Sequence, residues 1–207
     1  MGTSPVVTVI DDDEHVRESL AALVQSMRLD VDCYTSGTEF LENFEHARPG
    51  CVVLDLRLPQ LSGQEVLKEL GARRIRVPVI MITGHGDIPA AVTAMKAGAF
   101  DFLEKPYRGA VLIDCIRRAI AQDEHDSQVQ SDRDVLLSRY ETLTVDEKDV
   151  LWLTAEGKPD KAIAQRLDLS LRTIQLRRAS VMKKLQAESR ARLIRLAEML
   201  EKLPAAM

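Results

Sequence analysis

The chain has 207 residues, of which 45% are hydrophobic and 29% are charged, and its formal net charge at pH 7 is −4. This length is enough for one large domain or two small ones. No apolar run approaches the roughly 20 residues that span a bilayer, and the first residues lack the basic and long apolar regions of a signal peptide. We therefore expect a cytoplasmic protein with no membrane partner.

The charge is unevenly distributed along the chain. Residues 139–207 hold 14 Lys and Arg against 10 Asp and Glu, so this part carries about +4 and the part before it about −8. Two regions with different binding partners are therefore predicted.

Short β-type runs alternate with helical patterns over the first 121 residues. Apolar residues recur three and four positions apart in the helical patterns, as in amphipathic helices. The alternation predicts an α/β domain with a doubly wound, five-stranded parallel sheet of the flavodoxin-like kind and five helices. The predicted strands lie at 6–10, 31–34, 51–54, 77–82 and 100–103.

Polar or charged side chains stand at the ends of four of these strands. In a doubly wound sheet such ends face one crevice, where ligands bind. Carboxylates gathered there would raise one another's pKa unless a divalent cation lies between them, and Mg²⁺ suits carboxylates, water and phosphate oxygens. The residues at the strand ends are Asp11, Asp12, Asp13, Asp55, Thr83 and Lys105.

Asp55 points most directly to a function, because a carboxylate at the end of a buried strand needs a partner. A nucleophilic carboxylate with a metal, a hydroxyl and an ammonium can take up a phosphoryl group. A phosphatase of the haloacid dehalogenase type would have a second Asp two residues after the nucleophile, where Arg57 stands. A flavin phosphate site would need a loop rich in Ser, Thr and Gly after the first strand, where the chain reads DDDEH.

The stretches VIDDDEHVRESL, VVLDLRLPQLSG and VIMITGHGDIPAAVTAMKAGAFDFLEKPY resemble the receiver domain of two-component response regulators of the NarL/FixJ class. The resemblance implies that Asp55 is the phosphoacceptor and that a sensor histidine kinase is its partner. It also implies a Mg²⁺ or Mn²⁺ site formed by Asp12, Asp55 and the carbonyl of Arg57, with Asp11 acting through water.

Three further roles follow from the same resemblance. Thr83 and Lys105 would bind the phosphoryl oxygens, and Phe102 would be the aromatic switch residue. A cis peptide bond between Lys105 and Pro106 is implied as well, which agrees with the near restriction of cis peptides to proline.

The segment from Gln122 to Leu137 is polar, acidic and free of Pro and Gly. It continues the pattern of the fifth helix without a stop signal. We predict a helical or partly flexible linker at 122–138.

The remainder, 139–207, has only helical patterns and predicts an all-α domain. Thr144 with Glu147 three residues later indicates a capping box, and Gly157 would end that helix. A short helix, a tight turn near 168–170 and a longer helix predict a helix-turn-helix. The N-caps predicted for the last three helices are Asp160, Ser170 and Ser189.

The longer helix has basic side chains and no acidic one, although the whole chain is acidic. A solvated face would usually mix the two signs, so we favour contact with phosphates. The basic residues are Arg172, Arg177, Arg178, Lys183 and Lys184.

The stretch LTVDEKDVLWLTAEGKPDKAIAQRLDLSLRTIQLRRASVMKKL resembles the LuxR-type DNA-binding domain. The resemblance implies a buried face at Ile174, Val181 and Leu185. Two positions depart from the family pattern, because Asp160 replaces the usual Asn and Arg177 stands where His is frequent, so the operator sequence cannot be carried over. The implied DNA-binding residues are Arg172, Thr173, Gln175, Leu176, Arg177, Arg178, Ala179 and Lys183.

Together these features predict a phosphorylation-activated transcriptional regulator, with a receiver domain at 1–121, the linker at 122–138 and a helix-turn-helix domain at 139–207. It is not expected to be an enzyme, apart from assisting phosphorylation and dephosphorylation of its own Asp. Phosphorylation would favour a homodimer that pairs through Val92, Met95 and Lys96. This dimer would bind a double-stranded DNA operator, and RNA polymerase would be a further partner. The alternatives are a constitutive DNA-binding protein and a stand-alone phosphotransfer enzyme, and the second leaves the basic helix unexplained.

Overall fold

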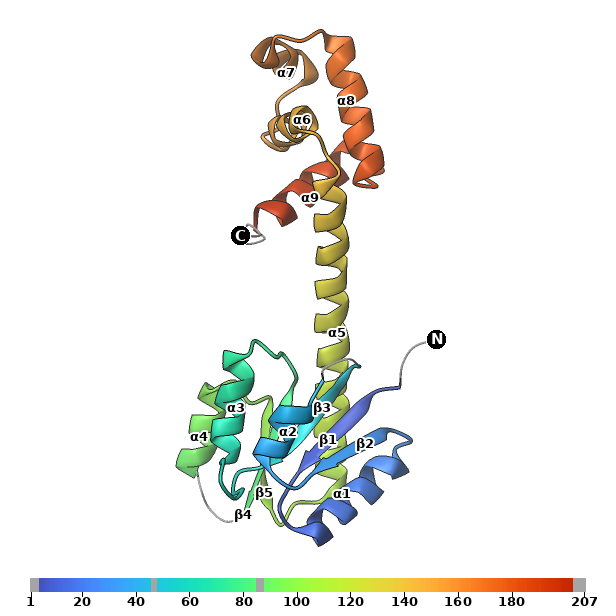
Figure 1. Ribbon diagram of the computed structural model, residues 1–207. Coiled ribbons are helices and arrows are strands. Elements are labelled where there is room, and N and C mark those ends of the chain that lie inside the picture. The colour runs from blue at the N-terminus through green and yellow to red at the C-terminus, as the bar shows by residue number, and fades with distance from the viewer. Residues whose placement is uncertain (1–3, 46–47, 85–87, 203–207) are drawn as a thin grey trace. The chain divides into compact units, whose positions relative to one another are not determined.

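The computed structural model describes residues 4–45, 48–84 and 88–202, and the chain divides into two compact units, Met1–Gln128 and Val129–Met207 (Figure 1). The first unit alternates strands and helices. Its elements are β1 Val6–Ile10, α1 Glu14–Ser26, β2 Asp30–Tyr34, α2 Gly37–Asn43, β3 Gly50–Asp55, α3 Gly63–Ala72, β4 Val79–Gly84, α4 Ile88–Lys96, β5 Asp101–Lys105 and α5 Gly109–Glu141. No helix in the described ranges is long and apolar enough to cross a bilayer.

The five strands form one parallel sheet in the order β2-β1-β3-β4-β5, so the predicted doubly wound fold is confirmed. β1 and β3 consist mostly of β-branched and other apolar residues, as expected for strands covered on both faces. β4 begins at Val79, two residues later than predicted. Pro78 has no backbone N–H to donate to a ladder, although its carbonyl accepts a hydrogen bond from Val52.

Each face of the sheet has its own hydrophobic core. On one face α1 and α5 pack against the strands through residues such as Leu20 and Ile116. On the other face α2, α3 and α4 do so through residues such as Phe40, Val66 and Ala94 (Figure 1). The helices thus bury both faces and leave the carboxyl ends of the strands as the open edge.

α5 is a continuous helix of 33 residues that includes the whole predicted linker, 122–138. Asp123, which is 1% exposed, accepts a hydrogen bond of 2.9 Å from the backbone N–H of Gly50 at the start of β3. Side-chain pairs four residues apart, such as Gln122 with Asp126, support the exposed surface of the helix. The helix therefore remains attached to the sheet beyond residue 121.

The second unit consists of helices in the part that the structure describes. The capping box of Thr144 and Glu147 is confirmed, as are the N-caps Ser170 and Ser189. The elements that follow α5 are α6 Val145–Ala155, α7 Asp160–Leu167, α8 Leu171–Lys184 and α9 Arg190–Glu201.

The predicted N-cap at Asp160 is wrong. Pro159 occupies that position without a side-chain cap, and Asp160 is the first residue of α7. Its carboxylate instead accepts a hydrogen bond of 2.7 Å from Arg178. Asp168, in the left-handed conformation with φ 54°, ends α7 and starts the turn to α8. The turn and the longer helix after it agree with the predicted helix-turn-helix.

A buried carboxylate connects α6 to α8. Glu147, 7% exposed, accepts hydrogen bonds from Ser180 at 2.6 Å, Lys184 at 2.7 Å and the backbone N–H of Thr144 at 2.8 Å. Burial alone would raise the pKa of Glu147, but these donors, Lys184 foremost, lower it to about 2. Because the folded-state pKa lies below the ordinary value of 4.5, the charged carboxylate stabilises the fold.

We expect Glu147→Gln to lower the free energy of unfolding of the second unit by about 1.5–3 kcal/mol at neutral pH, because it removes a charged acceptor from three donors. The difference from the wild type should be full above pH 4.5 and should shrink as the pH falls toward 2. Urea titrations followed by the fluorescence of Trp152, the single tryptophan of the chain, report on this unit. The exposed Glu198→Gln is the matched control, and equal unfolding free energies for both variants would contradict the assignment.

Candidate functional site

Three strand ends meet at Asp55, the last residue of β3, which is 9% exposed. Its Oδ1 accepts a hydrogen bond from the backbone N–H of Arg57 at 2.8 Å, and its Oδ2 accepts one from Lys105 Nζ at 2.5 Å. The same Nζ lies 2.9 Å from Oδ2 of Asp11, which follows β1. The predicted crevice residues Asp11, Asp55 and Lys105 are therefore in direct contact.

The charges of Asp55, Lys105 and Asp11 influence one another's ionisation. The pKa of Asp55 is raised, chiefly by burial and also by Asp11, while hydrogen bonds from Lys105 and Arg57 oppose the shift. Burial lowers the pKa of Lys105, but its bonds to Asp55 and Asp11 outweigh that effect and raise it. Lys105 thus stays charged and compensates two carboxylates that would otherwise repel each other.

The three consecutive acids after β1 have different surroundings. Asp11 is buried and accepts the backbone N–H of Asp13 at 3.0 Å. Asp13 caps α1 by accepting the N–H of His15 at 2.9 Å, so its carboxylate serves the helix start. Asp12 is exposed beside the crevice.

The side chains fit a hard divalent cation that completes its shell with water. In the described part of the chain, no three His, Cys, Asp or Glu side chains are close enough to hold a metal by themselves. Mg²⁺ commonly binds one or two carboxylates and keeps several waters. Asp55 and the exposed Asp12 are two such carboxylates, and Asp11 and the Arg57 carbonyl adjoin them in the chain.

Thr83 and Phe102 lie on strands beside the crevice. Thr83 is fully buried near the end of β4, and its hydroxyl donates to the carbonyl of Gly84 at 3.4 Å rather than to Asp55 or Lys105 within the described residues. Phe102 is partly buried and packs against the core cluster beneath α2, α3 and α4. The peptide bond between Lys105 and Pro106 is cis, as predicted. The roles of Thr83 and Phe102 stay predictions.

The proposed dimer residues form an exposed patch on α4. Val92 is 48% and Met95 46% exposed, and Lys96 is exposed as well. Exposed apolar side chains next to a cation are compatible with contact to another protein surface, but the dimer itself stays a prediction.

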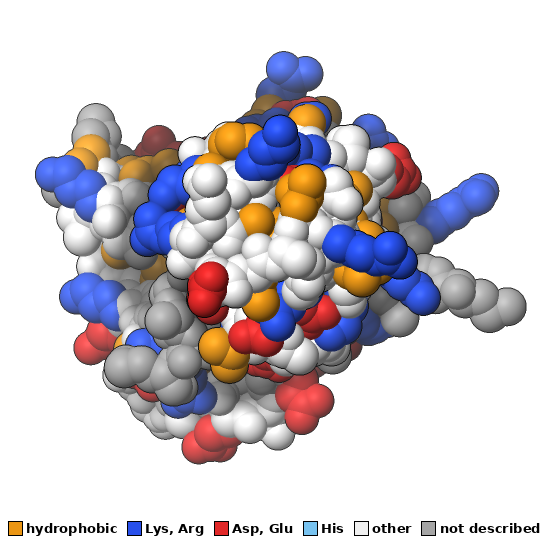
Figure 2. Space-filling view, turned by 90° about the horizontal axis from the view of Figure 1, so that it is seen from above, with side chains coloured by type: hydrophobic (Ala, Val, Ile, Leu, Met, Phe, Trp, Pro, Cys, Tyr) orange, Lys and Arg blue, Asp and Glu red, His pale blue; other side chains and the backbone are white. Residues whose placement is uncertain are grey.

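α8 has one buried and one exposed face. Ile174, Val181 and Leu185 are buried, which confirms the predicted core face. Leu176 is 64% exposed, and Lys and Arg side chains are interspersed with hydrophobic and acidic ones in the view from above (Figure 2). The other proposed DNA-binding residues are Arg172, Gln175, Ala179 and Lys183, which are exposed, and Thr173, Arg177 and Arg178, which are partly buried.

Three of the five basic residues of α8 form ion pairs with carboxylates. Lys184 binds Glu147, as described above, and also donates to the carbonyl of Thr142 at 3.0 Å, so it serves the fold. Arg177 and Arg178 form ion pairs with acids of α6 and α7 that the sequence reasoning missed. Periodicity within one helix gives no signal for such pairs. Among the described residues, Arg172 and Lys183 have no ion-pair partner.

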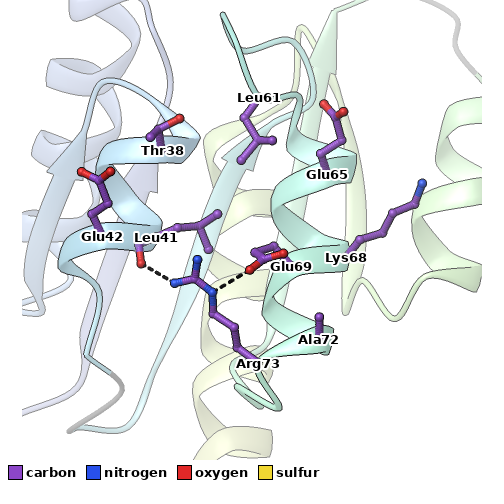
Figure 3. Close-up of a pocket in the computed structure, with 9 residues that line it drawn as sticks. All are labelled: Thr38, Leu41, Glu42, Leu61, Glu65, Lys68, Glu69, Ala72 and Arg73. Atoms are coloured by element: carbon purple, nitrogen blue, oxygen red, sulfur yellow. Dashed lines mark hydrogen bonds and ion pairs between the residues drawn. The ribbon is translucent and has the colours of Figure 1, made fainter.

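Sequence reasoning also missed a cavity of about 530 Å³ between α2 and α3. Arg73 crosses one side of it and donates to the carbonyl of Leu41 at 2.7 Å and to Glu69 at 2.8 Å (Figure 3). Glu42, Glu65 and Lys68 also line it, so acidic and basic side chains are mixed around it. None of the crevice residues lines this cavity.

The comparisons identify both halves of the chain. Residues 7–117 match the response regulator receiver domain, and residues 141–197 match the luxR family of bacterial regulatory proteins. The chain belongs to the LuxR-type response regulators.

Similar proteins match nearly the whole length of this chain. The transcriptional regulatory protein FixJ of Rhizobium meliloti is 43% identical over 198 residues, covering 94% of this chain and 96% of that protein. The response regulator protein TmoT of Ectopseudomonas mendocina is 39% identical and covers 95% of this chain and 89% of its own length. The solved structure of the response regulator StyR has a TM-score of 0.87 at 38% identity, covering 95% of this chain and all of that one. FixJ is named as a transcriptional regulator, and TmoT and StyR are named as response regulators.

We expect Lys105→Met to destabilise the first unit by about 1–3 kcal/mol in the presence of EDTA, because Asp11 and Asp55 would remain close together without a cation. Mg²⁺ should then raise the unfolding temperature of the variant more than that of the wild type. Calorimetry of the full chain with and without Mg²⁺ measures both effects. Lys68→Met, an exposed lysine on α3, is the matched control, and the same Mg²⁺ response in all three proteins would contradict this role of Lys105.

Proposed function

We propose that a sensor histidine kinase phosphorylates Asp55 of this DNA-binding transcriptional regulator and that phosphorylation promotes dimerisation and operator binding. Family membership supports the general function, because a receiver domain implies a histidine kinase and a LuxR-type domain implies DNA. The observation that carries the assignment to Asp55 is the contact of its carboxylate with Lys105, which also binds Asp11. The proposed domains remain 1–121, 122–138 and 139–207, in a cytoplasmic protein.

In the proposed transfer, a carboxylate oxygen of Asp55 forms a bond to phosphorus while the bond from phosphorus to the histidine nitrogen of the kinase breaks. Asp12, Asp55 and the Arg57 carbonyl, with Asp11 acting through water, would hold Mg²⁺ or Mn²⁺, which neutralises negative charge at the phosphoryl group. Lys105, already 2.5 Å from Asp55, would then move its hydrogen bond to a phosphoryl oxygen.

The switch would act through the neighbouring strands. The hydroxyl of Thr83 would turn from the carbonyl of Gly84 to the phosphoryl group, and Phe102 would occupy the space beside it. The resulting population shift would favour the α4 surface of Val92, Met95 and Lys96 for pairing with a second copy. Two DNA-binding domains on one operator add their contacts, and RNA polymerase would be a further partner at the promoter.

We expect Asp55→Asn to abolish acid-labile phosphorylation by a small phosphodonor with Mg²⁺, because the amide lacks the nucleophilic oxygen. The fold should persist, since the asparagine Oδ1 can still accept from the backbone N–H of Arg57 and Lys105 keeps its ion pair with Asp11. Intact-mass spectrometry measures the phosphoryl group. Asp32→Asn, an exposed acid on β2, is the control and should be phosphorylated normally. A phosphoryl group added to Asp55→Asn at the wild-type rate would refute the assignment.

We expect Lys96→Glu to prevent dimerisation and weaken operator binding while phosphorylation of Asp55 continues. The reversed charge would lie on the α4 surface proposed to pair with a second copy. Light scattering and DNA-binding anisotropy, each with and without phosphodonor, measure the two steps separately. Lys68→Glu is the control for the charge change. If the wild type has the same mass and DNA affinity in both states, it is a constitutive DNA-binding protein instead.

A further inference from the structure

The peptide groups on both sides of Asp12 are held by hydrogen bonds. Arg17 Nη1 on α1 donates to the backbone carbonyl of Asp11 at 2.8 Å. The backbone N–H of Asp13 donates to Oδ1 of Asp11 at 3.0 Å. The first bond holds the peptide group before the Cα of Asp12, and the second holds the peptide group after it. Because each peptide group is planar, fixing both restricts φ and ψ of Asp12 and with them the direction of its side chain.

Arg17 reaches this loop because of its place in α1. The helix begins at Glu14, and the backbone N–H of Arg17 donates to the carbonyl of Asp13 at 3.0 Å. Side chains of a helix tilt toward its N-terminus, so the guanidinium extends back past the first turn to Asp11. The side chain is partly buried. A hydrogen bond from a charged donor is stronger than one between neutral groups, so this bond can hold the loop.

The positive charge of Arg17 would by itself work against a metal site. A cation beside such a site repels the metal, so a role of charge alone would weaken the binding of Mg²⁺. The hydrogen bond of the guanidinium is made to a carbonyl, and the side chain has no ion pair among the described residues. The pKa of Glu39 on α2 is lowered chiefly by hydrogen bonds from Thr35 and more weakly by Arg17. Charge and position therefore predict opposite effects of Arg17 on Mg²⁺.

We propose that Arg17 is a positioning residue that holds the backbone of Asp12 so that its carboxylate can bind the divalent cation. Asp12 is exposed and its carboxylate has no hydrogen bond among the described residues, so its direction depends on the backbone. A ligand held in place loses less conformational freedom when it binds. Groups that orient the ligands of a metal strengthen metal binding. This inference rests on the proposed Mg²⁺ site of Asp12, Asp55 and the Arg57 carbonyl.

The test measures Mg²⁺ binding to the unphosphorylated full-length protein by isothermal titration calorimetry. Arg17→Met removes the donor and the charge, and its affinity for Mg²⁺ should fall roughly threefold to tenfold, the effect of losing one hydrogen bond behind a ligand. Arg17→Lys keeps a charged donor and should bind Mg²⁺ more tightly than Arg17→Met. Arg76→Met is the matched control, because it removes an exposed arginine before β4, at the opposite edge of the sheet. The control should keep the wild-type affinity.

Two further measurements separate positioning from a general effect on the fold. Arg17→Met added to Asp12→Ala should lower the Mg²⁺ affinity no further, because Arg17 acts through Asp12. At saturating Mg²⁺, a small phosphodonor should phosphorylate Arg17→Met at the wild-type rate, since Asp55 and Lys105 are unchanged. Only the Mg²⁺ concentration that gives half the maximal rate should rise. Thermal unfolding followed by calorimetry confirms that each variant is folded.

An unchanged or higher Mg²⁺ affinity in Arg17→Met would overturn the inference, because charge alone predicts a rise. A further loss of affinity in the double variant, or Arg17→Lys binding no more tightly than Arg17→Met, would also overturn it. Asp12→Ala separates this failure from a failure of the proposed site. If Asp12→Ala weakens Mg²⁺ binding while Arg17→Met does not, only the inference fails. If Asp12→Ala keeps the wild-type affinity, the proposed Mg²⁺ site fails too.

Discussion

The ammonium of Lys105 between two buried carboxylates is the interaction on which the functional edge of the sheet depends. β1 and β3 are adjacent and in register, with Ile10 opposite Leu54, so Asp11, which follows β1, lies next to Asp55, the last residue of β3. Neighbouring strands lie only about 4.8 Å apart. Two carboxylates this close cannot both stay charged in a buried site without a cation. A phosphoryl group on Asp55 and a bound metal would both change the charge that Lys105 faces. Phosphorylation would therefore alter this contact directly.

In the second unit, the buried carboxylate of Glu147 has a structural role. Glu147 joins α6 to Ser180 and Lys184 of α8, and the buried Ile174 and Val181 fix which face of α8 points inward. The opposite face, with Gln175 and Leu176 exposed, is therefore presented on a rigid support. A helix that reads DNA needs this rigidity, because contacts to base edges depend on direction as well as distance.

Local features of the fold were predictable from the sequence, and distant partners were not. Strand runs, the capping box and the N-caps at Ser170 and Ser189 depend on residues within a few positions of one another. The group of Asp11, Asp55 and Lys105 was also predictable, because the ends of parallel strands share one edge. The sequence predicts Asp160 as a cap, but its carboxylate pairs with Arg178, 18 residues away, and the hydrogen bond from Gly50 to Asp123 spans 73 residues. The helical and strand periodicities of a sequence do not predict contacts between residues this far apart in the chain.

The ion pairs between α8 and other helices reduce the number of cations that are free to contact DNA. The basic surplus of residues 139–207 suggests a strong general attraction to DNA, yet three of the five cations on α8 are already paired with carboxylates. Fewer free cations on α8 mean fewer counterions released there, so DNA binding should depend less on salt than the basic surplus alone suggests. Two copies on one operator add their contacts. In the proposed dimer, the contacts of the second copy would therefore contribute to operator occupancy in addition to the free cations of the first.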